Sequence, residues 1–374
     1  MGLCHRSREI MSAMSIELRL DSYPDDPEKI AFCTDFLEGK SPRYLLGRNQ
    51  WAQSISRHLN VAGFIDEYCH ESEFLGKPVL SLDEVPDNGI VVSTVVGILP
   101  LTVALKLSER NIRHIDYFAF RRYSGLTLEP VLFWDEFITD YSRHQEKYEE
   151  VYCCLKDQQS RTIYENLINF RLSGDLSYMD GFEDRQHQQY FEDFLNLKNQ
   201  GEVFLDVGCF DGLTSLEFIK RCPEYAGIHI FEPEPGNLKV VRKNLADYPR
   251  IVFHDCGLSD HSQTLRFSAD GSSSRVSDQG ELQIQVERLD DVIKGPGSFI
   301  KMDIEGAEIE ALRGARHTIL EHHPKLAICV YHRADDFWKI PETVFSIRDD
   351  YDLYLRHYTE GVTETVMFFI PAGN

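Results

Sequence analysis

Basic residues are scarce in this chain. In 374 residues, 39 lysines and arginines stand against 61 aspartates and glutamates, which gives a formal net charge of −22. So much negative charge repels phosphate backbones, so we expect no nucleic-acid partner. A long apolar run is missing as well, because the stretch at residues 90–107 is interrupted by Ser93, Thr94, Gly97 and Pro100. We therefore expect no membrane insertion.

Several other signatures are also lacking. The nine cysteines form no Cys-x-x-Cys pair, no His/Cys cluster has zinc spacing, and the N-terminus has no apolar core of signal-peptide length. These absences predict reduced thiols and a cytoplasmic protein. With 42% hydrophobic and 27% charged residues, the chain has the composition of a globular protein with room for two domains.

The most informative segment that is present is EVFLDVGCFDG, residues 202–212. An apolar run carries Asp206 near its end and breaks at Gly208 and Gly212, and a helical pattern begins at Thr214. Glycines in such a strand-to-helix turn let backbone N–H groups approach a ligand closely. Gly-x-x-x-Gly behind an acid differs from the Gly-x-Gly-x-x-Gly of dinucleotide sites, so it favours S-adenosylmethionine over NAD.

Strands alternate with helices in two stretches of the chain, which predicts two α/β units with mainly parallel sheets. The first unit, residues 1–125, has a helical pattern at 49–59 and 99–110 and strands at 43–46, 61–65, 76–79, 90–93 and 115–118. Residues 126–185 mix aromatic and charged residues irregularly and suit a helical connector.

The second unit, residues 186–374, has strand patterns at 203–207, 228–231, 251–254, 299–302 and 326–330, and a helix at 309–321. Residues 261–288 alternate polar and apolar around a Gly/Ser turn at 271–274, which predicts an inserted antiparallel hairpin. Two last strands, 353–357 and 365–370, meet at a Gly361 turn. A parallel sheet closed by an antiparallel hairpin is the layout of class I, Rossmann-like methyltransferases.

Each parallel strand of the second unit ends in a polar residue. Ligands bind in open α/β sheets beyond the carboxyl ends of the strands. We therefore expect a shared site formed by Asp206, Glu232, Asp255, Asp303 and His332.

Some of these residues suit a bound S-adenosylmethionine. Glu232 follows Gly208 by 24 residues and can accept hydrogen bonds from both ribose hydroxyls. Asp255 is expected at the adenine amino group. Gly208 and Gly212 are expected beside the methionine part, with Thr214 at the start of the next helix. Asp206 either orients this loop or takes the cofactor's amino group.

Methyl transfer to an alcohol requires a well-placed nucleophile and removal of its proton. Asp303 and His332 are the candidate catalytic residues, because a histidine near neutral pKa can take a proton from a hydroxyl. Alternatively, Asp303, Glu305 and His332 hold Mg²⁺, which would lower the pKa of a bound hydroxyl. Direct base catalysis and metal assistance both stay open. Lys301 is expected to be a salt-bridge partner.

The second unit resembles the FkbM family of S-adenosylmethionine-dependent methyltransferases over roughly residues 182–370. The matching stretches are FLDVGCFDGLTSLEFI, IFEPEPGNL, HDCGLSD, FIKMDIEGAEIEALRGA, AICVYHRADDFWKIPE and YLRHYTEGVTETV. The resemblance implies O-methylation, often of hydroxyls on sugars or polyketides, and it implies that Tyr190 closes over the cofactor. The segment at Asp255 departs from the family pattern, where many relatives have an asparagine and small residues.

The first unit resembles the nucleotide-sugar-binding domain that precedes sugar acyltransferases. The matching pieces are YLLGRNQWAQSI, GFIDEY and FLGKPVLSLDEVP. The resemblance implies a nucleotide site in which Arg48 meets a phosphate. Because the first loop has only Gly47 where a phosphate loop carries more glycines, the alternative is a domain used for packing or for contacts between copies of the chain.

These observations together predict an S-adenosylmethionine-dependent O-methyltransferase acting on a hydroxyl of a sugar, nucleotide sugar or glycan. One alternative is an NAD(P)-dependent oxidoreductase, against which the glycine spacing and the closing hairpin count. The other is a non-catalytic nucleotide-sugar-binding protein with a decayed methyltransferase domain, against which the intact set of strand-end acids counts.

Overall fold

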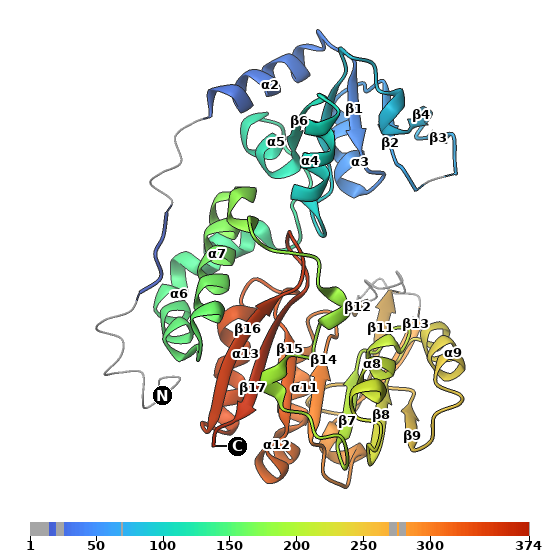
Figure 1. The fold of residues 1–374 in the computed structure, drawn as a ribbon, viewed down its shortest axis with the longest axis vertical. Coiled ribbons are helices and arrows are strands. Elements are labelled where there is room, and N and C mark those ends of the chain that lie inside the picture. The colour runs from blue at the N-terminus through green and yellow to red at the C-terminus, as the bar shows by residue number, and fades with distance from the viewer. Residues whose placement is uncertain (1–14, 20–25, 69, 269–274, 277–281, 374) are drawn as a thin grey trace.

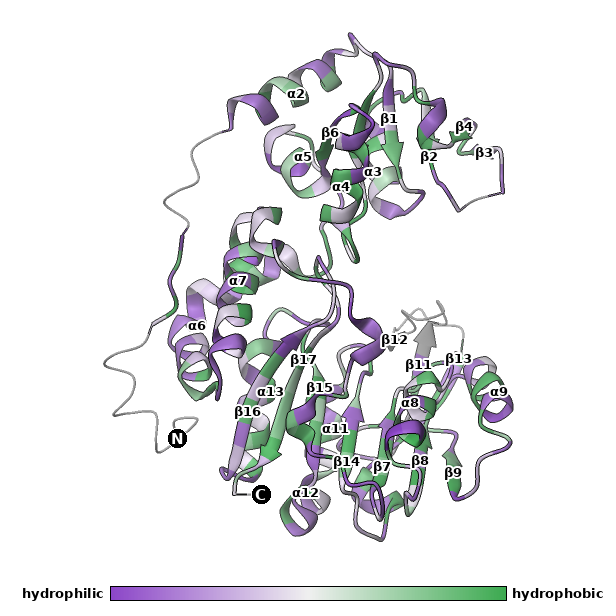
Figure 2. Ribbon diagram, in the orientation of Figure 1, coloured by the Kyte–Doolittle hydropathy of each residue, from purple (hydrophilic) through white to green (hydrophobic). Residues whose placement is uncertain are grey.

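Two α/β units with a helical pair between them make up the molecule (Figure 1). The structure is a computed structural model that describes residues 15–19, 26–68, 70–268, 275–276 and 282–373. Hydrophobic residues gather along the central strands of the two larger sheets, as Figure 2 shows.

The N-terminal unit is built on a six-stranded sheet of order β3-β4-β2-β1-β5-β6, parallel apart from the β3–β4 pair. Its strands are β1 Arg43–Leu46, β2 Gly63–Ile65, β3 Glu73–Phe74, β4 Lys77–Leu80, β5 Ile90–Ser93 and β6 Arg113–Asp116. Its helices are α2 Pro27–Glu38, α3 Gln50–His58, η2 Leu82–Glu84, α4 Pro100–Glu109 and α5 Tyr117–Tyr123.

The strand predicted at residues 115–118 ends early. Asp116 closes β6 and caps α5, because its carboxylate accepts the backbone N–H of Ala119 at 2.9 Å. The apolar residues Tyr117 and Phe118 are therefore helical, although they are buried as a strand there would be.

Two long helices lie between the units in the aromatic-rich segment. They are α6 Trp134–Cys154 and α7 Gln158–Ser173, and three short helical turns follow: η3 Leu176–Met179, η4 Gln186–Gln188 and η5 Asp193–Leu195. The aromatic side chains at Trp134, Phe137, Tyr141 and Tyr148 are buried.

The C-terminal unit has a seven-stranded sheet of order β16-β17-β15-β14-β7-β8-β9. The pairs from β15 across to β9 are parallel, whereas β17 lies antiparallel to both β15 and β16. The strands are β7 Val203–Val207, β8 Gly227–Phe231, β9 Ile251–His254, β14 Phe299–Met302, β15 Lys325–Cys329, β16 Tyr351–His357 and β17 Thr365–Pro371. This is the predicted Rossmann-like methyltransferase sheet with its closing hairpin.

Helices cover both faces of this sheet, and a small second sheet is inserted before β14. The helices are α8 Leu213–Arg221, α9 Pro235–Asn244, α10 Leu289–Val292, α11 Glu308–Gly314, α12 Arg316–His322 and α13 Asp336–Ile347. The insertion contains β10 Gly257–Leu258, β11 Gln263–Ser268, β12 Arg275–Val276 and β13 Leu282–Glu287. Its β11–β13 pair is antiparallel, as predicted, and the expected turn at 271–274 lies outside the described residues.

The helices of the C-terminal unit differ from the prediction in several places, two of which have a clear physical cause. The helix predicted at 309–321 is divided at Ala315 into α11 and α12. Gly314 at this break packs so closely that an added Cβ would lie 2.0 Å from the Ser259 carbonyl oxygen. Helix α13 is absent from the predicted elements, because Pro341 lies inside it and interrupts the helical pattern.

The two units touch through the turn between β16 and β17. The Glu360 carboxylate accepts the backbone N–H and the hydroxyl of Thr102, each at 2.8 Å, and the Glu360 carbonyl accepts the N–H of Leu99 at 3.2 Å. The Thr363 hydroxyl donates to the Gly97 carbonyl at 3.1 Å. The start of α4 is thereby fixed against this turn.

Candidate active site

The glycine turn after β7 is held against the end of β14. Gly208 has φ +75°, and a Cβ there would lie 1.9 Å from the carbonyl oxygen of Asp303. A side chain cannot fit in this contact, so glycine is required both by conformation and by space. Gly212, with φ +83°, ends the turn and opens α8, and Thr214 lies half-buried in the first turn of that helix.

Asp206 lies inside the fold, with no exposed surface. Its Oδ2 accepts the Ser215 hydroxyl at 2.7 Å, and its Oδ1 lies 3.3 Å from Nζ of Lys301. Lys301 also donates to the Gly208 carbonyl. Burial alone would lower the pKa of Lys301, but the charges of Asp206 and then Asp303 raise it. Lys301 is thus the predicted salt-bridge partner. Its ion pair with Asp206 and its bond to the Gly208 carbonyl hold the glycine turn in place.

Glu232, at the end of β8, lies beside the same turn. Its Oε2 accepts the N–H of Phe210 at 3.2 Å and its Oε1 accepts the N–H of Glu234 at 3.0 Å. The side chain is nearly buried, and burial raises its pKa above the ordinary value. A carboxylate has about four acceptor positions, so Glu232 can still accept from a ligand hydroxyl. Asp255 follows the neighbouring strand β9 and is exposed.

Asp303, just after β14, is the centre of a polar cluster. Its Oδ2 accepts the Tyr190 hydroxyl at 2.8 Å, its Oδ1 accepts the Tyr331 hydroxyl at 3.3 Å, and Nε2 of His332 lies 3.3 Å from Oδ1. Burial alone would raise the pKa of Asp303, but the contact with His332 and the charge of Lys301 hold it well below its usual range. Asp303 is therefore a carboxylate at every ordinary pH.

His332 is enclosed by acids. Its Nδ1 lies 2.9 Å from Oε1 of Glu308, and its Nε2 lies 3.8 Å from Oε2 of Glu305. Burial alone would lower the pKa of His332, but Glu308 and Asp303 raise it well above the ordinary value. We conclude that the ring is an imidazolium at neutral pH. Its Nε2 is buried and faces Asp303 and Glu305, so the ring is paired with an acid at both nitrogens.

A buried carboxylate holds the loop that carries His332. Oδ2 of Asp336, at the start of α13, accepts the backbone N–H groups of His332 at 3.0 Å and of Arg333 at 2.7 Å. Burial and the charge of Glu308 raise the pKa of Asp336 to about 7. Glu308 and Asp336 were absent from the predicted site, and the helical spacing around them gave no sign that both would face His332.

Comparison with known proteins identifies the domain that carries this site. Residues 206–360 match the model of the methyltransferase FkbM domain. These residues belong to the FkbM methyltransferase family.

One solved structure with the same fold agrees with this assignment. The chain is similar to the crystal structure of methyltransferase FkbM from Methylobacillus flagellatus KT, with 25% identity, a TM-score of 0.72, and coverage of 97% of this chain and 99% of that one. An rRNA methylase from Streptococcus thermophilus matches 48% of this chain and 93% of its own, with 13% identity and a TM-score of 0.34. A search of curated proteins finds no match. None of the helices in the described part of the chain has the length and apolarity to cross a membrane.

The magnesium alternative finds no support in the FkbM domain. Within the described residues, no three His, Cys, Asp or Glu side chains are grouped as a metal site.

Sequence reasoning missed a further acid of the C-terminal unit, Glu364. It ends the turn between β16 and β17 with a left-handed backbone, φ +62°, and its carbonyl accepts the N–H of Tyr358 at 3.0 Å. Burial and the charge of Asp303 raise its pKa to about 7. The strand pairing could have revealed it. Because β17 begins beside the end of β15, with Val366 opposite Cys329, the residue just before β17 lies near the carboxyl end of the sheet.

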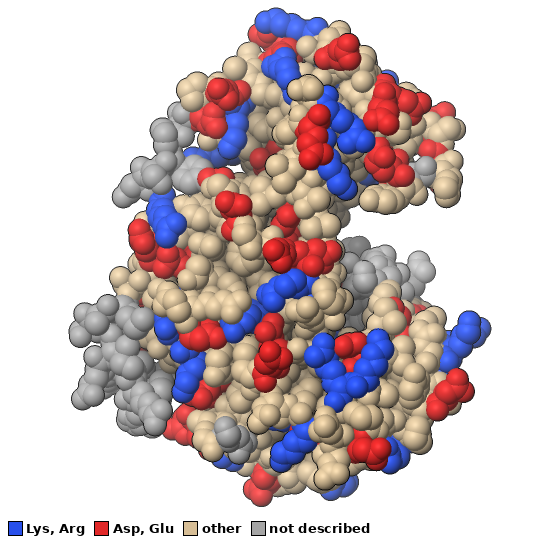
Figure 3. Space-filling model, in the orientation of Figure 1, with Lys and Arg blue, Asp and Glu red and all other residues tan. Residues whose placement is uncertain are grey.

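The carboxyl ends of the two large sheets face each other. The turn at 358–364 lies at the carboxyl end of β15 in the FkbM domain, and it contacts the segment at 97–102 that follows β5 in the N-terminal unit. Figure 3 shows the molecule hollowed on one side between the units, with basic and acidic side chains interleaved over this face. In the N-terminal unit, Arg48 forms ion pairs with Asp66 and Glu71. The side chain that was expected to bind a phosphate therefore already pairs with two acids.

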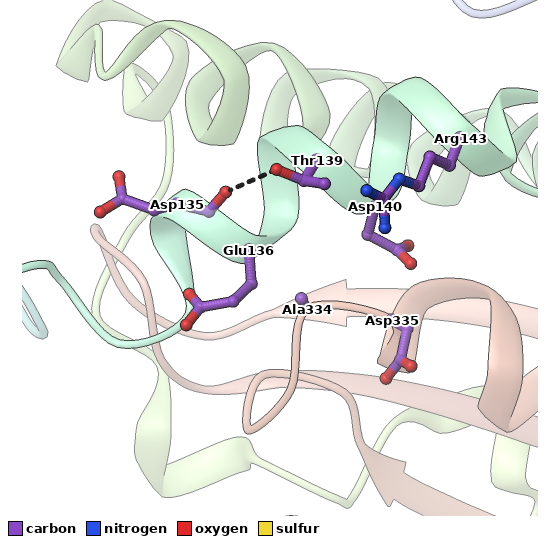
Figure 4. A pocket seen from close by; sticks show the side chains of 7 residues that line it. All are labelled: Asp135, Glu136, Thr139, Asp140, Arg143, Ala334 and Asp335. Atoms are coloured by element: carbon purple, nitrogen blue, oxygen red, sulfur yellow. Dashed lines mark hydrogen bonds between the residues drawn. The ribbon is translucent and has the colours of Figure 1, made fainter.

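A pocket of about 480 Å³ lies between α6 and the loop before α13 (Figure 4). Its wall includes Asp140, whose Oδ2 accepts the Tyr148 hydroxyl at 2.7 Å and the Trp338 N–H at 2.8 Å. This acid therefore joins the connector to α13. The pocket is lined by Asp135, Glu136, Thr139, Asp140, Arg143, Ala334 and Asp335.

Proposed function

We propose that the chain transfers the methyl group of S-adenosylmethionine to a hydroxyl of a sugar, nucleotide sugar or glycan. The observation that carries the proposal is the cluster of Asp303 and His332 beside the glycine turn of an FkbM methyltransferase domain. Oδ1 of Asp303 and Nε2 of His332 lie 3.3 Å apart there.

The residues around the glycine turn fit S-adenosylmethionine. Glu232 offers its carboxylate to the ribose hydroxyls, and Gly208 and Gly212 add no side chain at the two ends of the turn. Asp255 lies at the next strand end, where the adenine amino group is expected. Asp206 acts by orienting the turn, because its carboxylate is already taken by Ser215 and Lys301. Thr214 and Tyr190 complete the proposed cofactor site.

The chemistry of the acceptor follows from the charges in the cluster. Asp303 accepts a hydrogen bond from the acceptor hydroxyl, and His332, which pairs with Oδ1 of Asp303, keeps this carboxylate ionised and in place. When bound, S-adenosylmethionine supplies an already activated methyl group, so the protein's task is to place the hydroxyl. Because His332 is an imidazolium, it helps to place the acceptor and does not accept the proton of its hydroxyl. A hydroxyl-rich ligand suits a site with this many hydrogen-bond acceptors.

The facing carboxyl ends of the two sheets also support the proposed class of acceptor. A nucleotide sugar held at the end of the N-terminal sheet would present its sugar toward the methyltransferase site.

Calorimetric titration with S-adenosylhomocysteine tests the cofactor, with NAD⁺ as the parallel control. Micromolar binding of S-adenosylhomocysteine alone is expected. Binding of NAD⁺ alone would support the oxidoreductase alternative, and binding of neither would support the decayed-domain alternative. The acceptor is then sought by incubating the protein with S-adenosylmethionine and a panel of nucleotide sugars and glycans, measuring S-adenosylhomocysteine formed. Methylation on nitrogen or carbon, with none on oxygen, would contradict the proposed reaction.

A further inference from the structure

Arg333 follows His332 directly in the loop between β15 and α13, and it is exposed. Its side chain lies against Gly306, because a Cβ added to Gly306 would lie 3.3 Å from Cγ of Arg333 and 3.7 Å from Cβ of His332. Its Nη1 donates to the Gly306 carbonyl at 3.3 Å. The side chain of Arg333 therefore joins the two loops that carry Asp303 and His332.

A buried carboxylate fixes the backbone of Arg333. The N–H of Arg333 donates to Oδ2 of Asp336 at 2.7 Å, and the N–H of His332 donates to the same oxygen at 3.0 Å. Asp336 is only 1% exposed. Because one oxygen holds both residues, Arg333 keeps a constant place relative to His332, whose Nε2 lies 3.3 Å from Oδ1 of Asp303. A group bound by Arg333 would thus have a fixed offset from a hydroxyl bound by Asp303.

The guanidinium of Arg333 has no acid of its own. Among the described residues, no carboxylate forms an ion pair with it, although acids are close in the chain. Asp335 pairs with Lys339, and Glu305 faces His332. An arginine offers five N–H donors, and the Gly306 carbonyl takes one of them. The remaining donors are open to an anionic group of a ligand.

We infer that Arg333 is a specificity-determining residue that binds an anionic group, phosphate or carboxylate, of the acceptor. The inference rests on the proposed function and narrows its acceptor class to sugars that carry such a group, as nucleotide sugars do. A planar guanidinium donates two parallel N–H bonds to the oxygens of a phosphate or carboxylate. With the anionic group held there, Arg333 helps to set which hydroxyl of the sugar reaches Asp303.

The centre of the site is less suited to an anionic group. Its two cations, Lys301 and His332, have nearly buried side chains that are already paired with acids. Glu308 and Asp303 would repel a second negative charge placed beside them. The anionic group of an acceptor is therefore favoured at the exposed Arg333, while the neutral hydroxyl enters the centre.

The test measures sugar binding by calorimetry to protein saturated with S-adenosylhomocysteine. The probes are glucose, galactose and mannose, each as the free sugar, the 1-phosphate and the uronic acid. For at least one sugar we expect an anionic form to bind roughly 10-fold or more tightly than the free form. A preference for the 1-phosphate assigns the group as phosphate, and a preference for the uronic acid assigns it as carboxylate.

Variants connect this preference to Arg333. Arg333→Gln should reduce the preference to about twofold or less and leave the affinity for S-adenosylhomocysteine unchanged, which also shows that the variant folds. Arg333→Lys should restore part of it, because a lysine keeps the charge without the paired donors. Arg316→Gln, which removes another exposed arginine at the start of α12, should keep the full preference.

Two results would overturn the inference and leave the proposed methyltransferase in place. One is that no anionic form binds more tightly than its free sugar, and the other is that Arg333→Gln keeps the full preference. Absence of S-adenosylhomocysteine binding by the wild type would instead refute the proposed function itself.

Discussion

Gly361 approaches Gly97 so closely that a Cβ on Gly361 would lie 2.5 Å from the Gly97 carbonyl oxygen. The two residues belong to different units, and their contact sets the position of the turn that carries Glu364. Gly361 also has φ +110°, a conformation in which a side chain is strained.

Gly361→Ala should therefore destabilise the protein and displace this turn. We expect a loss of about 1–3 kcal/mol in the free energy of unfolding, measured by denaturant titration. Gly181→Ala is the matched control, because Gly181 has φ +83° but nothing within 4 Å of an added Cβ. A loss no larger than that of the control would mean that the contact between the units contributes nothing.

Glu232→Ala should weaken S-adenosylhomocysteine binding by roughly 10- to 100-fold, since a charged hydrogen bond is worth about 1.5–3 kcal/mol. Calorimetry measures the change. Glu217→Ala, on the outer surface of α8 and paired with Lys220 and Arg221, should bind as the wild type does. Unchanged affinity in Glu232→Ala would remove this residue from the cofactor site.

Asp303→Ala and His332→Ala should each lower turnover more than they weaken S-adenosylhomocysteine binding. Both side chains are proposed to orient the acceptor, an effect worth roughly 100-fold or more in rate. Steady-state kinetics and calorimetry on the same preparations separate the two quantities. Normal turnover in both variants would show that the reaction takes place elsewhere.

Stability should fall in mild acid because of His357. This buried residue bonds Thr365 through Nδ1 at 2.9 Å, and burial, aided by the charge of Arg171, lowers its pKa to about 3. The unfolded chain binds a proton near pH 6.5, so stability is present above that pH and is lost progressively between pH 6.5 and about 3. His357→Gln should flatten this loss by on the order of 2–4 kcal/mol in unfolding experiments from pH 7 to 4. His317→Gln, at an exposed site, should not.

The sequence predicted the elements that carry local signals. Strands 203–207, 251–254 and 299–302 agree with the structure to the residue, because each is an apolar run ended by polar or turn residues. The strand-end acids Asp206, Glu232 and Asp303 could be found for the same reason. What escaped prediction depends on contacts between distant segments. The break at Ala315 follows from the packing of Gly314 on Ser259, and Glu364 lies near the end of β15 only after β17 has paired with that strand.

The opposed carboxyl ends of the two sheets have a consequence for the choice of acceptor. A molecule anchored at one end meets the other at a high effective concentration, on the order of millimolar, provided that it can span the distance. A molecule of the same chemistry that is too short to span the distance has no such increase in effective concentration. The length of the acceptor, as well as its hydroxyl groups, should therefore decide which compounds are methylated.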